Sequence, residues 1–264
     1  MASYDIIGNI AIIKGDGKNK KQKLEQAKKL LKIPSVKTVL EKAGKVKGRL
    51  RTIKPKYIAG EKNFIVNYKE NACRFKFDIR TCYFSPRLSN DRKQVALKIK
   101  KKDNVLVMFS GVGVYPIVIS KYKKPARIVS IELGRDCNKY AIENARLNQM
   151  QDNIEFIQGD VKKKIKKGGL IVKGNLVPLQ FDFIMMARPN LKDSFLEQAL
   201  IASKKGTRIF YHLFCRDKDL KEEVEKLVSE AKELGRKIQV KKKVFAGEIA
   251  PYKHRYRIEI KVLN

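Results

Sequence analysis

Four short apolar runs follow one another through the middle of the chain: Val105–Phe109, Ile128–Ile131, Ile154–Ile157 and Phe181–Met186. Short runs that are mostly apolar are typical of strands buried on both faces of a parallel sheet, and the first of these runs carries no polar residue. The first run continues into Ser110-Gly111-Val112-Gly113 and then into a stretch that can form a helix. A strand, a glycine turn and a helix in this order predict the start of a nucleotide-binding βαβ unit.

The pattern on either side predicts a doubly wound α/β domain over residues 81–264, preceded by a small α+β module over residues 1–80. In the module it predicts one strand over Tyr4–Lys14, a helix over Lys18–Lys32 and a basic loop over Gly44–Arg51. In the larger domain it predicts further helices over 85–100, 136–148, 190–203 and 217–234, a fifth strand over 207–213, and two closing strands over 238–244 and 256–262. Residues 162–173 are basic and glycine-containing, which favours a solvated excursion.

Acidic residues follow two of the apolar runs at the edge where a ligand binds. Glu132 ends the second run, Gly159-Asp160 follow the third, and Ala187-Arg188-Pro189 follow the fourth. In open α/β sheets ligands bind beyond the carboxyl ends of the strands, so we expect these residues to converge. One acid can accept from ribose hydroxyls and the other from an adenine amino group. This set suits S-adenosylmethionine, whereas a structural glycine turn beside ordinary surface acids is the alternative.

Two nucleotide-binding patterns are missing from the glycine turn. No Gly-Lys-Ser/Thr follows it, which argues against a P-loop, and Pro116 occupies the place of the third dinucleotide-binding glycine. A nicotinamide dehydrogenase is therefore disfavoured.

The net charge of the chain indicates that the protein has a polyanionic partner in addition to a small-molecule cofactor. The 60 lysines and arginines against 27 acids give a net charge of +33. In an enzyme-sized chain such an excess indicates nucleic acid. A lysine-rich, thermophilic proteome is the alternative explanation for part of it.

Cysteine usage and hydropathy exclude several other classes. The four cysteines are dispersed with no Cys-x-x-Cys and only two histidines beside them, so we expect reduced thiols and no metal site. No apolar run approaches the roughly 18 residues of a membrane span, and the N-terminus lacks a signal-peptide pattern. We therefore expect a cytoplasmic, non-membrane protein.

The segment TCYFSPRLSNDR, which precedes the glycine turn, contains residues that favour the N-terminus of a helix. Ser85 is a good N-cap and Pro86 a good first residue. Arg87 and Asp91 lie four apart, on one face of this helix. A surface ion pair is the simple interpretation.

Taken together, these stretches resemble the archaeal tRNA (guanine-37 N1)-methyltransferase family and the related wybutosine-pathway enzymes. The resemblance covers nearly the whole chain and is most specific in TCYFSPRLSNDR. The other matching stretches are KGRLRTIKPKYIAGEKN, MFSGVGVYPIVISK, IELGRDCNKYAIENARLN, QGDV, FIMMARPNLKDSFLEQAL and FAGEIAPYKHRYRIEI. It implies a class I, Rossmann-like methyltransferase domain after a module that contacts the tRNA anticodon stem-loop, in a monomer.

The resemblance also implies roles for individual residues. Asp91, where the family commonly has Glu, would take the proton from guanine N1, Arg51 (with Arg49 as second choice) would stabilise O6, and Pro189 would shape the base pocket. S-adenosylmethionine would contact Tyr83, Arg87, Phe109, Ser110, Gly111, Val112, Gly113, Tyr115, Glu132, Leu133, Asp160, Val161 and Ala187. Candidates for RNA contacts are Lys45, Lys47, Arg49, Arg92 and Arg188, with the basic residues at 162–167.

Three functions remain open at this point. Simple N1 methylation of guanine-37 is preferred. Because Ala187 stands where the family commonly has Asn, an enzyme acting on the tricyclic wyosine base, by methyl or aminocarboxypropyl transfer, is the nearest rival. A non-catalytic RNA-binding protein with a vestigial cofactor fold is the third, although both Glu132 and Asp160 are intact.

Overall fold

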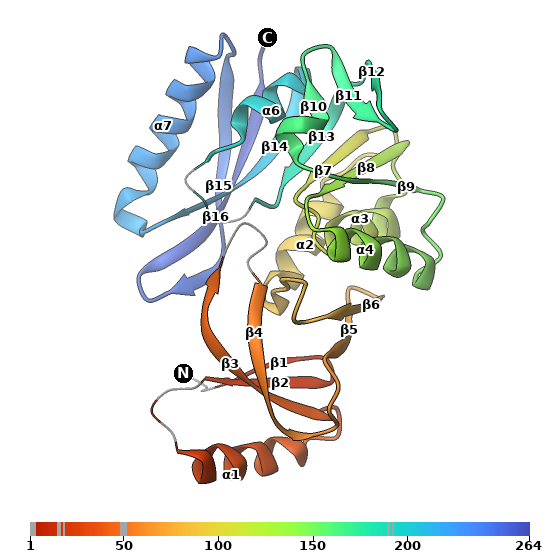
Figure 1. Ribbon diagram of the computed structural model, residues 1–264. Helices are drawn as coiled ribbons and strands as arrows, with labels where there is room; N and C mark the ends of the chain where they lie inside the picture. Colours follow the sequence, from red (N-terminus) through yellow and green to blue (C-terminus); the bar gives the residue numbers. More distant parts are fainter. Residues whose placement is uncertain (1–3, 15–16, 18, 48–51, 189–190, 192) are drawn as a thin grey trace.

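A seven-stranded sheet forms the centre of the molecule (Figure 1). The computed structural model describes the chain except residues 1–3, 15–16, 18, 48–51, 189–190 and 192, and the side chains of 43–47. From one edge, the sheet runs β15 (Ile238–Ala250), β16 (Lys253–Val262), β14 (Ser203–Cys215), β13 (Phe181–Met186), β7 (Asn104–Met108), β8 (Arg127–Glu132) and β9 (Ile154–Gln158). The five strands from β14 to β9 are parallel, whereas β16 is antiparallel to both its neighbours. The predicted doubly wound α/β fold is confirmed.

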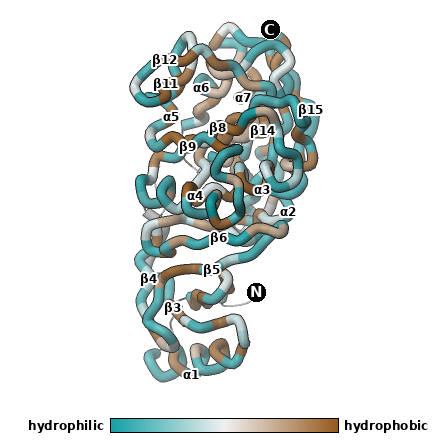
Figure 2. Tube along the Cα trace, turned by 90° about the vertical axis from the view of Figure 1, so that its right-hand side faces the viewer, coloured by the Kyte–Doolittle hydropathy of each residue, from teal (hydrophilic) through white to brown (hydrophobic). Residues whose placement is uncertain are grey.

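The central strands are mostly apolar because helices cover both faces of the sheet. On β7, Val105 and Val107 face a core shared with α2 (Ser89–Leu97), α3 (Val114–Lys123) and α4 (Arg135–Leu147). Leu106 and Met108 face a second core shared with α6 (Leu196–Ile201) and α7 (Leu220–Glu233). The hydropathy colouring shows the same arrangement, with the apolar trace gathered around β8 and β14 (Figure 2).

The N-terminal module is a four-stranded sheet with one helix. Its order is β1 (Tyr4–Ile7), β2 (Ile10–Lys14), β3 (Thr38–Lys47) and β4 (Thr52–Gly60), and α1 (Lys20–Leu31) covers one face. Asn19 caps α1 through a reciprocal capping box with Gln22. Ile10 and Ile12 face the other side, where they join the core of the larger domain.

The single strand predicted over Tyr4–Lys14 is wrong, because the chain reverses within it. Gly8 has φ +59, and β1 and β2 pair as an antiparallel hairpin. The turn then packs against the next hairpin: the Asn9 amide donates to the Ile65 carbonyl (3.1 Å) and its oxygen accepts from the Asn67 N–H (2.7 Å). Polar and apolar residues alternate only loosely over Tyr4–Lys14, so their pattern did not reveal the turn.

A second hairpin, β5 (Ile65–Glu70) and β6 (Cys73–Asp78), joins the module to α4. The N–H groups of Arg74 and Lys76 donate to the side-chain oxygens of Asn148 and Asn144 on α4, at 2.8 and 2.7 Å. Asparagines facing an edge strand thus supply the acceptors that a third strand would otherwise supply.

Three other predictions need correction. Residues 162–173 are not a solvated excursion: they form α5 (Val161–Lys164), β10 (Ile165–Lys166) and β11 (Gly169–Val172), and with β12 (Asn175–Val177) they bury Ile165 and Leu170. The helix predicted over 190–203 is only the short α6. The helix predicted over 85–100 begins as a 3₁₀ turn, Pro86–Leu88, before α2.

Among the described helices, none is long and apolar enough to cross a membrane.

The turn at Gly8 offers a test of this packing. A Cβ at Gly8 would lie 1.9 Å from the Asn67 carbonyl oxygen, whereas Gly17, with φ +63, has open space around it. We expect Gly17→Ala to cost about 1 kcal/mol from positive φ alone. Gly8→Ala should cost at least about 1 kcal/mol more, because backbone must shift. Equal losses in thermal unfolding of the two variants would show that the modules are not packed through this turn.

Candidate functional site

A cavity that is open to solvent lies beyond the carboxyl ends of β7, β8, β9 and β13. The segments after those four strands converge there, as the parallel topology requires. The lining residues are Tyr83, Leu88, Phe109, Gly111, Glu132, Leu133, Cys137, Gly159, Asp160, Val161, Ala187, Arg188, Leu191, Phe195, His212 and Arg255.

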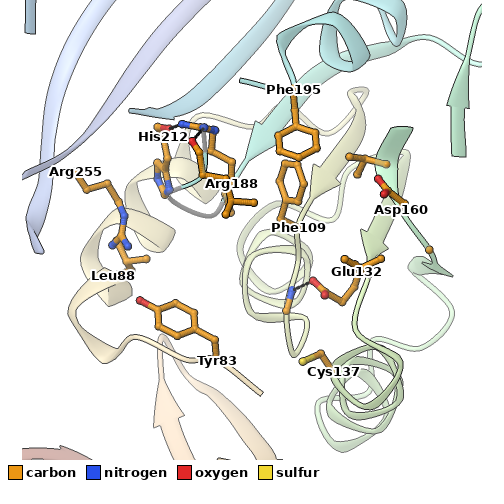
Figure 3. A pocket seen from close by; sticks show the side chains of 16 residues that line it. Tyr83, Leu88, Phe109, Glu132, Cys137, Asp160, Arg188, Phe195, His212 and Arg255 are labelled. Carbon is orange, nitrogen blue, oxygen red and sulfur yellow. Dashed lines mark hydrogen bonds between the residues drawn. The ribbon is translucent and has the colours of Figure 1, made fainter. Parts of the chain in front are cut away.

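Two aromatic residues in unusual backbone conformations stand at the middle of the cavity. Phe109 has φ +62 and Phe195 has φ +55, values that bulky residues rarely adopt. Their rings meet edge to face with centroids 4.9 Å apart (Figure 3). Strain of this kind persists only where packing enforces it, and it concentrates at functional sites.

Glu132 and Asp160 form the acidic side of the cavity, as Figure 3 shows. The Glu132 carboxylate accepts from the N–H of Gly111 (2.8 Å) and of Gly134 (2.7 Å). Burial raises the pKa of Glu132, and these two amides partly offset the rise. Each carboxylate oxygen has two lone pairs, so Glu132 keeps acceptor capacity toward the cavity. Asp160 caps α5 by accepting from the Lys162 N–H (3.0 Å).

The opposite side in Figure 3 carries His212, Arg188 and Arg255. His212 lies on β14 directly opposite Arg257 of β16. Arg188 donates to the carbonyl of Leu191 (2.8 Å) and so holds the loop after β13. The cavity therefore has an acidic side, built by the parallel strand ends, and a cationic side, to which β16 contributes.

Behind the cationic side, Asp91 is the centre of a buried polar cluster. Its carboxylate pairs with Arg257, accepts from the Tyr115 hydroxyl (2.6 Å) and lies 3.2 Å from His212 Nε2. Burial alone would raise the pKa of Asp91, but the hydrogen bond and charge of His212, with Arg257 and Tyr115, hold that pKa below its ordinary range. Burial lowers the pKa of His212, and Asp91 only partly offsets this.

The surface pair predicted between Arg87 and Asp91 is wrong. Arg87 pairs with Asp5 instead, at 2.6 Å, while the Asp91 side chain is 5% exposed. Asp91 is separated from the cavity by His212, which lines it.

Eight of the predicted cofactor residues line the cavity: Tyr83, Phe109, Gly111, Glu132, Leu133, Asp160, Val161 and Ala187. Five others lie outside the lining. Arg87 lines a neighbouring hollow, and Tyr115 is buried against Asp91. Ser110 is buried and its hydroxyl has no partner, while Val112 is in the core and Gly113 begins α3.

The sequence interpretation missed Leu88, Cys137, Gly159, Leu191, Phe195, His212 and Arg255. All of these except His212 lie within stretches that carry the resemblance, and Gly159 was expected at this edge, but none of them was assigned a role in the site. His212 stands inside a strand of the sheet and outside those stretches.

The candidate RNA residues have different outcomes. Arg92 is not available to a phosphate: it pairs with Glu70 inside the protein, with side chains 3% and 2% exposed. Arg188 is 6% exposed and lines the cavity, so it too is removed from the surface. The residues Arg49, Arg51 and Pro189 lie outside the described residues, as do the side chains of Lys45 and Lys47.

Within the described part of the chain, no three His, Cys, Asp or Glu side chains are grouped to hold a metal ion. The cavity instead offers carboxylates, aromatic rings and glycine backbone on one side, and a histidine and guanidinium groups on the other. This set can bind a cationic organic molecule next to an acceptor that becomes anionic.

Comparison with known proteins agrees with this geometry. Residues 66–241 match the TRM5/TYW2 methyltransferase domain, and residues 1–63 match the TYW2 N-terminal domain. A protein of Nanoarchaeum equitans named tRNA (guanine(37)-N(1))/4-demethylwyosine(37)-methyltransferase Taw22 is 31% identical, over 98% of this chain and 99% of its own. Trm5b of Pyrococcus abyssi is 30% identical, over 98% of this chain and 74% of its own.

Solved structures show the same fold over the whole chain. The crystal structure of Pyrococcus abyssi Trm5b has a TM-score of 0.83 and covers 99% of this chain and 75% of that one. A complex of aTrm5 with tRNALeu has a TM-score of 0.84 at 26% identity, covering 100% of this chain and 72% of that one. The match of 66–241, the full-length likeness and the shared fold together establish that this chain belongs to the TRM5/TYW2 methyltransferase family.

Proposed function

We propose that this protein transfers a methyl group from S-adenosylmethionine to N1 of guanine-37, beside the tRNA anticodon. The observation that carries the proposal is the two-sided cavity, in which Glu132 and Asp160 face His212 and Arg255 across a single space. Two of the relatives named above bear this activity in their names. The net charge of +33 supports a tRNA partner.

The acidic side fits S-adenosylmethionine by the chemistry of its donors. Glu132 is positioned by two amides and suits the ribose hydroxyls, and Asp160 suits the adenine amino group. Apolar Leu133 and Val161 suit the faces of an adenine ring, and the partnerless Ser110 hydroxyl lies beside the glycine turn. When bound, the cofactor supplies a methyl group on a positively charged sulfur.

The protein's own task is to handle the proton of the acceptor. Guanine N1 carries a proton and is a poor nucleophile until that proton leaves. Asp91 was the predicted base, but its carboxylate is held by Arg257, Tyr115 and His212 and does not line the cavity. His212 lines the cavity and is neutral because burial lowers its pKa, so it can accept a proton. We therefore assign the transfer to His212, with Asp91 orienting the ring and stabilising its charged form.

A second acceptor is supported by the loop after β13. Ala187 lines the cavity where the resemblance led us to expect Asn, which leaves an apolar wall rather than an amide. An apolar wall suits a base with a larger ring system, and the Nanoarchaeum relative is named for both guanine and 4-demethylwyosine. We propose the tricyclic base at the same position as the alternative substrate.

Mass spectrometry of the anticodon loop tests the function directly. The protein is incubated with S-adenosylmethionine and tRNA carrying either guanine-37 or 4-demethylwyosine-37, and nuclease fragments are weighed. We expect a gain of one methyl group on guanine-37. We expect no gain on a tRNA that already carries N1-methylguanine at position 37. Reaction with the tricyclic base alone would replace the first proposal by the second. No gain on either tRNA would refute both.

Cofactor binding should depend on Glu132. We expect Glu132→Ala to weaken S-adenosylmethionine binding by roughly 1.5–3 kcal/mol, the scale of hydrogen bonds to a charged group. Isothermal titration measures it, with Glu225→Ala on the exposed face of α7 as the control. Wild-type affinity in Glu132→Ala would remove Glu132 from the ribose site.

The proton-transfer assignment separates His212 from Asp91. We expect His212→Asn to lower single-turnover methylation by about a hundredfold or more, as loss of a general base does. Asp91→Asn should also slow the reaction and should alter its pH dependence, because the charged form of His212 loses its partner. Asp91→Glu, which restores the residue commoner in the family, should recover part of the rate.

Circular dichroism and cofactor titration serve as controls, since Asp91 is also a buried structural charge. His254→Asn is the matched histidine control, because His254 lies outside the cavity. A near wild-type rate in His212→Asn, with a large loss in Asp91→Asn, would return the base role to Asp91.

A further inference from the structure

The hairpin of β15 and β16 carries the most exposed large hydrophobic side chain among the described residues. Tyr252, at the tip of this hairpin, is 82% exposed, and Phe245, further back on β15, is 59% exposed. The other large hydrophobic side chains in the described part of the chain are 51% exposed or less. A single exposed hydrophobic side chain is common on protein surfaces, but the backbone and the position of Tyr252 are not ordinary.

The backbone at Tyr252 is strained. Ala250 pairs with Lys253, so Pro251 and Tyr252 form a two-residue turn, and Tyr252 has φ +59. A positive φ directly after proline is the pattern of a turn that favours glycine or asparagine at this position. The two other aromatic residues with positive φ in the described chain, Phe109 and Phe195, both line the cofactor cavity. Strain of this kind concentrates at functional sites, which indicates that the ring of Tyr252 meets a ligand.

The tip of the hairpin lies close to the cationic side of the cavity. Ile249, three residues before Tyr252, lines a hollow between the small module and the larger domain, and Arg255, three residues after it, lines both this hollow and the cavity. At about 3.3 Å per residue, Tyr252 is roughly 10 Å along the strand from Arg255. In Figure 1 this end of the hairpin lies next to β3 and β4 of the module, which also line the hollow. Tyr252 therefore stands at the edge of the hollow, on the side of the cavity where the acceptor would lie.

The charges around Tyr252 favour an RNA base over an apolar partner. Basic residues outnumber acids there: Lys253, Lys42 and Arg87 of the hollow, and the exposed lysines at 241–243 of β15, against Asp5 and Glu248. Cations around an exposed aromatic ring suit a single-stranded nucleic acid, whose phosphates contact the cations while a base stacks on the ring. Every base has a flat π-face, so this contact does not require one particular sequence.

We propose that Tyr252 stacks on an unpaired base of the anticodon loop that neighbours the acceptor base. The inference rests on the proposed function, and it names the part of the tRNA that the β15–β16 hairpin contacts. An acceptor base must leave the stack of its neighbours before it can enter the cavity, and this movement costs stacking energy. A neighbouring base that stacks on Tyr252 recovers part of that cost. The hairpin thus holds the loop with the acceptor base separated from its neighbour.

The chain contains no tryptophan, so a single one can report on this contact. Tyr252→Trp keeps a ring that can stack, and a base stacked on an indole quenches its fluorescence. We expect quenching when this variant is saturated with an anticodon stem-loop in the presence of S-adenosylhomocysteine, and none with a duplex of the same stem that lacks the loop. Phe245→Trp is the matched control on the same hairpin. Its fluorescence should not change, because Phe245 packs against Tyr256, which belongs to the core under α6 and α7.

Affinity separates stacking from a structural role of the turn. Tyr252→Gly removes the ring and relieves the positive φ. We therefore expect stem-loop binding to weaken about tenfold, the scale of one stacked base, while the midpoint of thermal unfolding does not fall. Tyr252→Phe should bind as the wild type does, because it keeps the face of the ring. Gln149→Gly is the control: Gln149 is exposed just after α4 with the same φ of +59, and its replacement should not alter affinity.

Wild-type affinity in Tyr252→Gly would overturn the proposal, as would unquenched fluorescence in Tyr252→Trp. Equal quenching by the duplex without a loop would place the ring on the stem, and a fluorescence change that follows protein concentration without RNA would place it against a second copy of the chain. Either result contradicts the proposal. Absence of methyl transfer by the wild type is a separate result, which refutes the proposed function and leaves the stacking contact to be judged by binding alone.

Discussion

The buried carboxylate of Asp91 holds four elements of the large domain at one point. It comes from α2, and its partners Tyr115, His212 and Arg257 come from α3, β14 and β16. Removing one partner of a buried ion pair leaves an uncompensated charge, which commonly costs about 3–5 kcal/mol. The cationic side of the cavity therefore depends on this cluster for its shape, whichever member handles a proton. It also explains why a helix outside the sheet, α2, is fixed relative to the closing strands.

The two sides of the cavity have different structural origins. The ends of the parallel strands β8 and β9 present the acids, as open α/β sheets generally do. The other side comes from β14 and its antiparallel neighbour β16, whose alternate residues Arg255, Arg257 and Glu259 share one face. Under the proposed function, the acids hold the cofactor and the cationic side faces the acceptor, so both sets of polar groups are in place before either molecule binds.

The sheet and the acidic side could be predicted from sequence because their signals are local. Burial on both faces makes β7 and β13 mostly apolar, and Glu132 and Asp160 stand at the ends of two neighbouring runs of the same kind. The cationic side could not, because its contacts join distant parts of the chain: Asp91 meets His212 across 121 residues and Arg257 across 166. Arg92 looked like a surface cation because its partner Glu70 is on another element. Residues 162–173 were predicted to be solvated because they are rich in lysine, although Ile165 and Leu170 among them are buried.

The packing of the small module has a mechanical consequence. One face of β2 shares a continuous apolar core with β6 and α3, through Ile12, Phe77 and Ile117. One face of the module's sheet therefore belongs to the hydrophobic core of the larger domain. The hairpin β5–β6, bonded to α4, braces the same junction. The module is thus packed against the larger domain rather than joined to it by a flexible linker. The distance from the outer surface of the module to the cavity is therefore fixed by the folded structure.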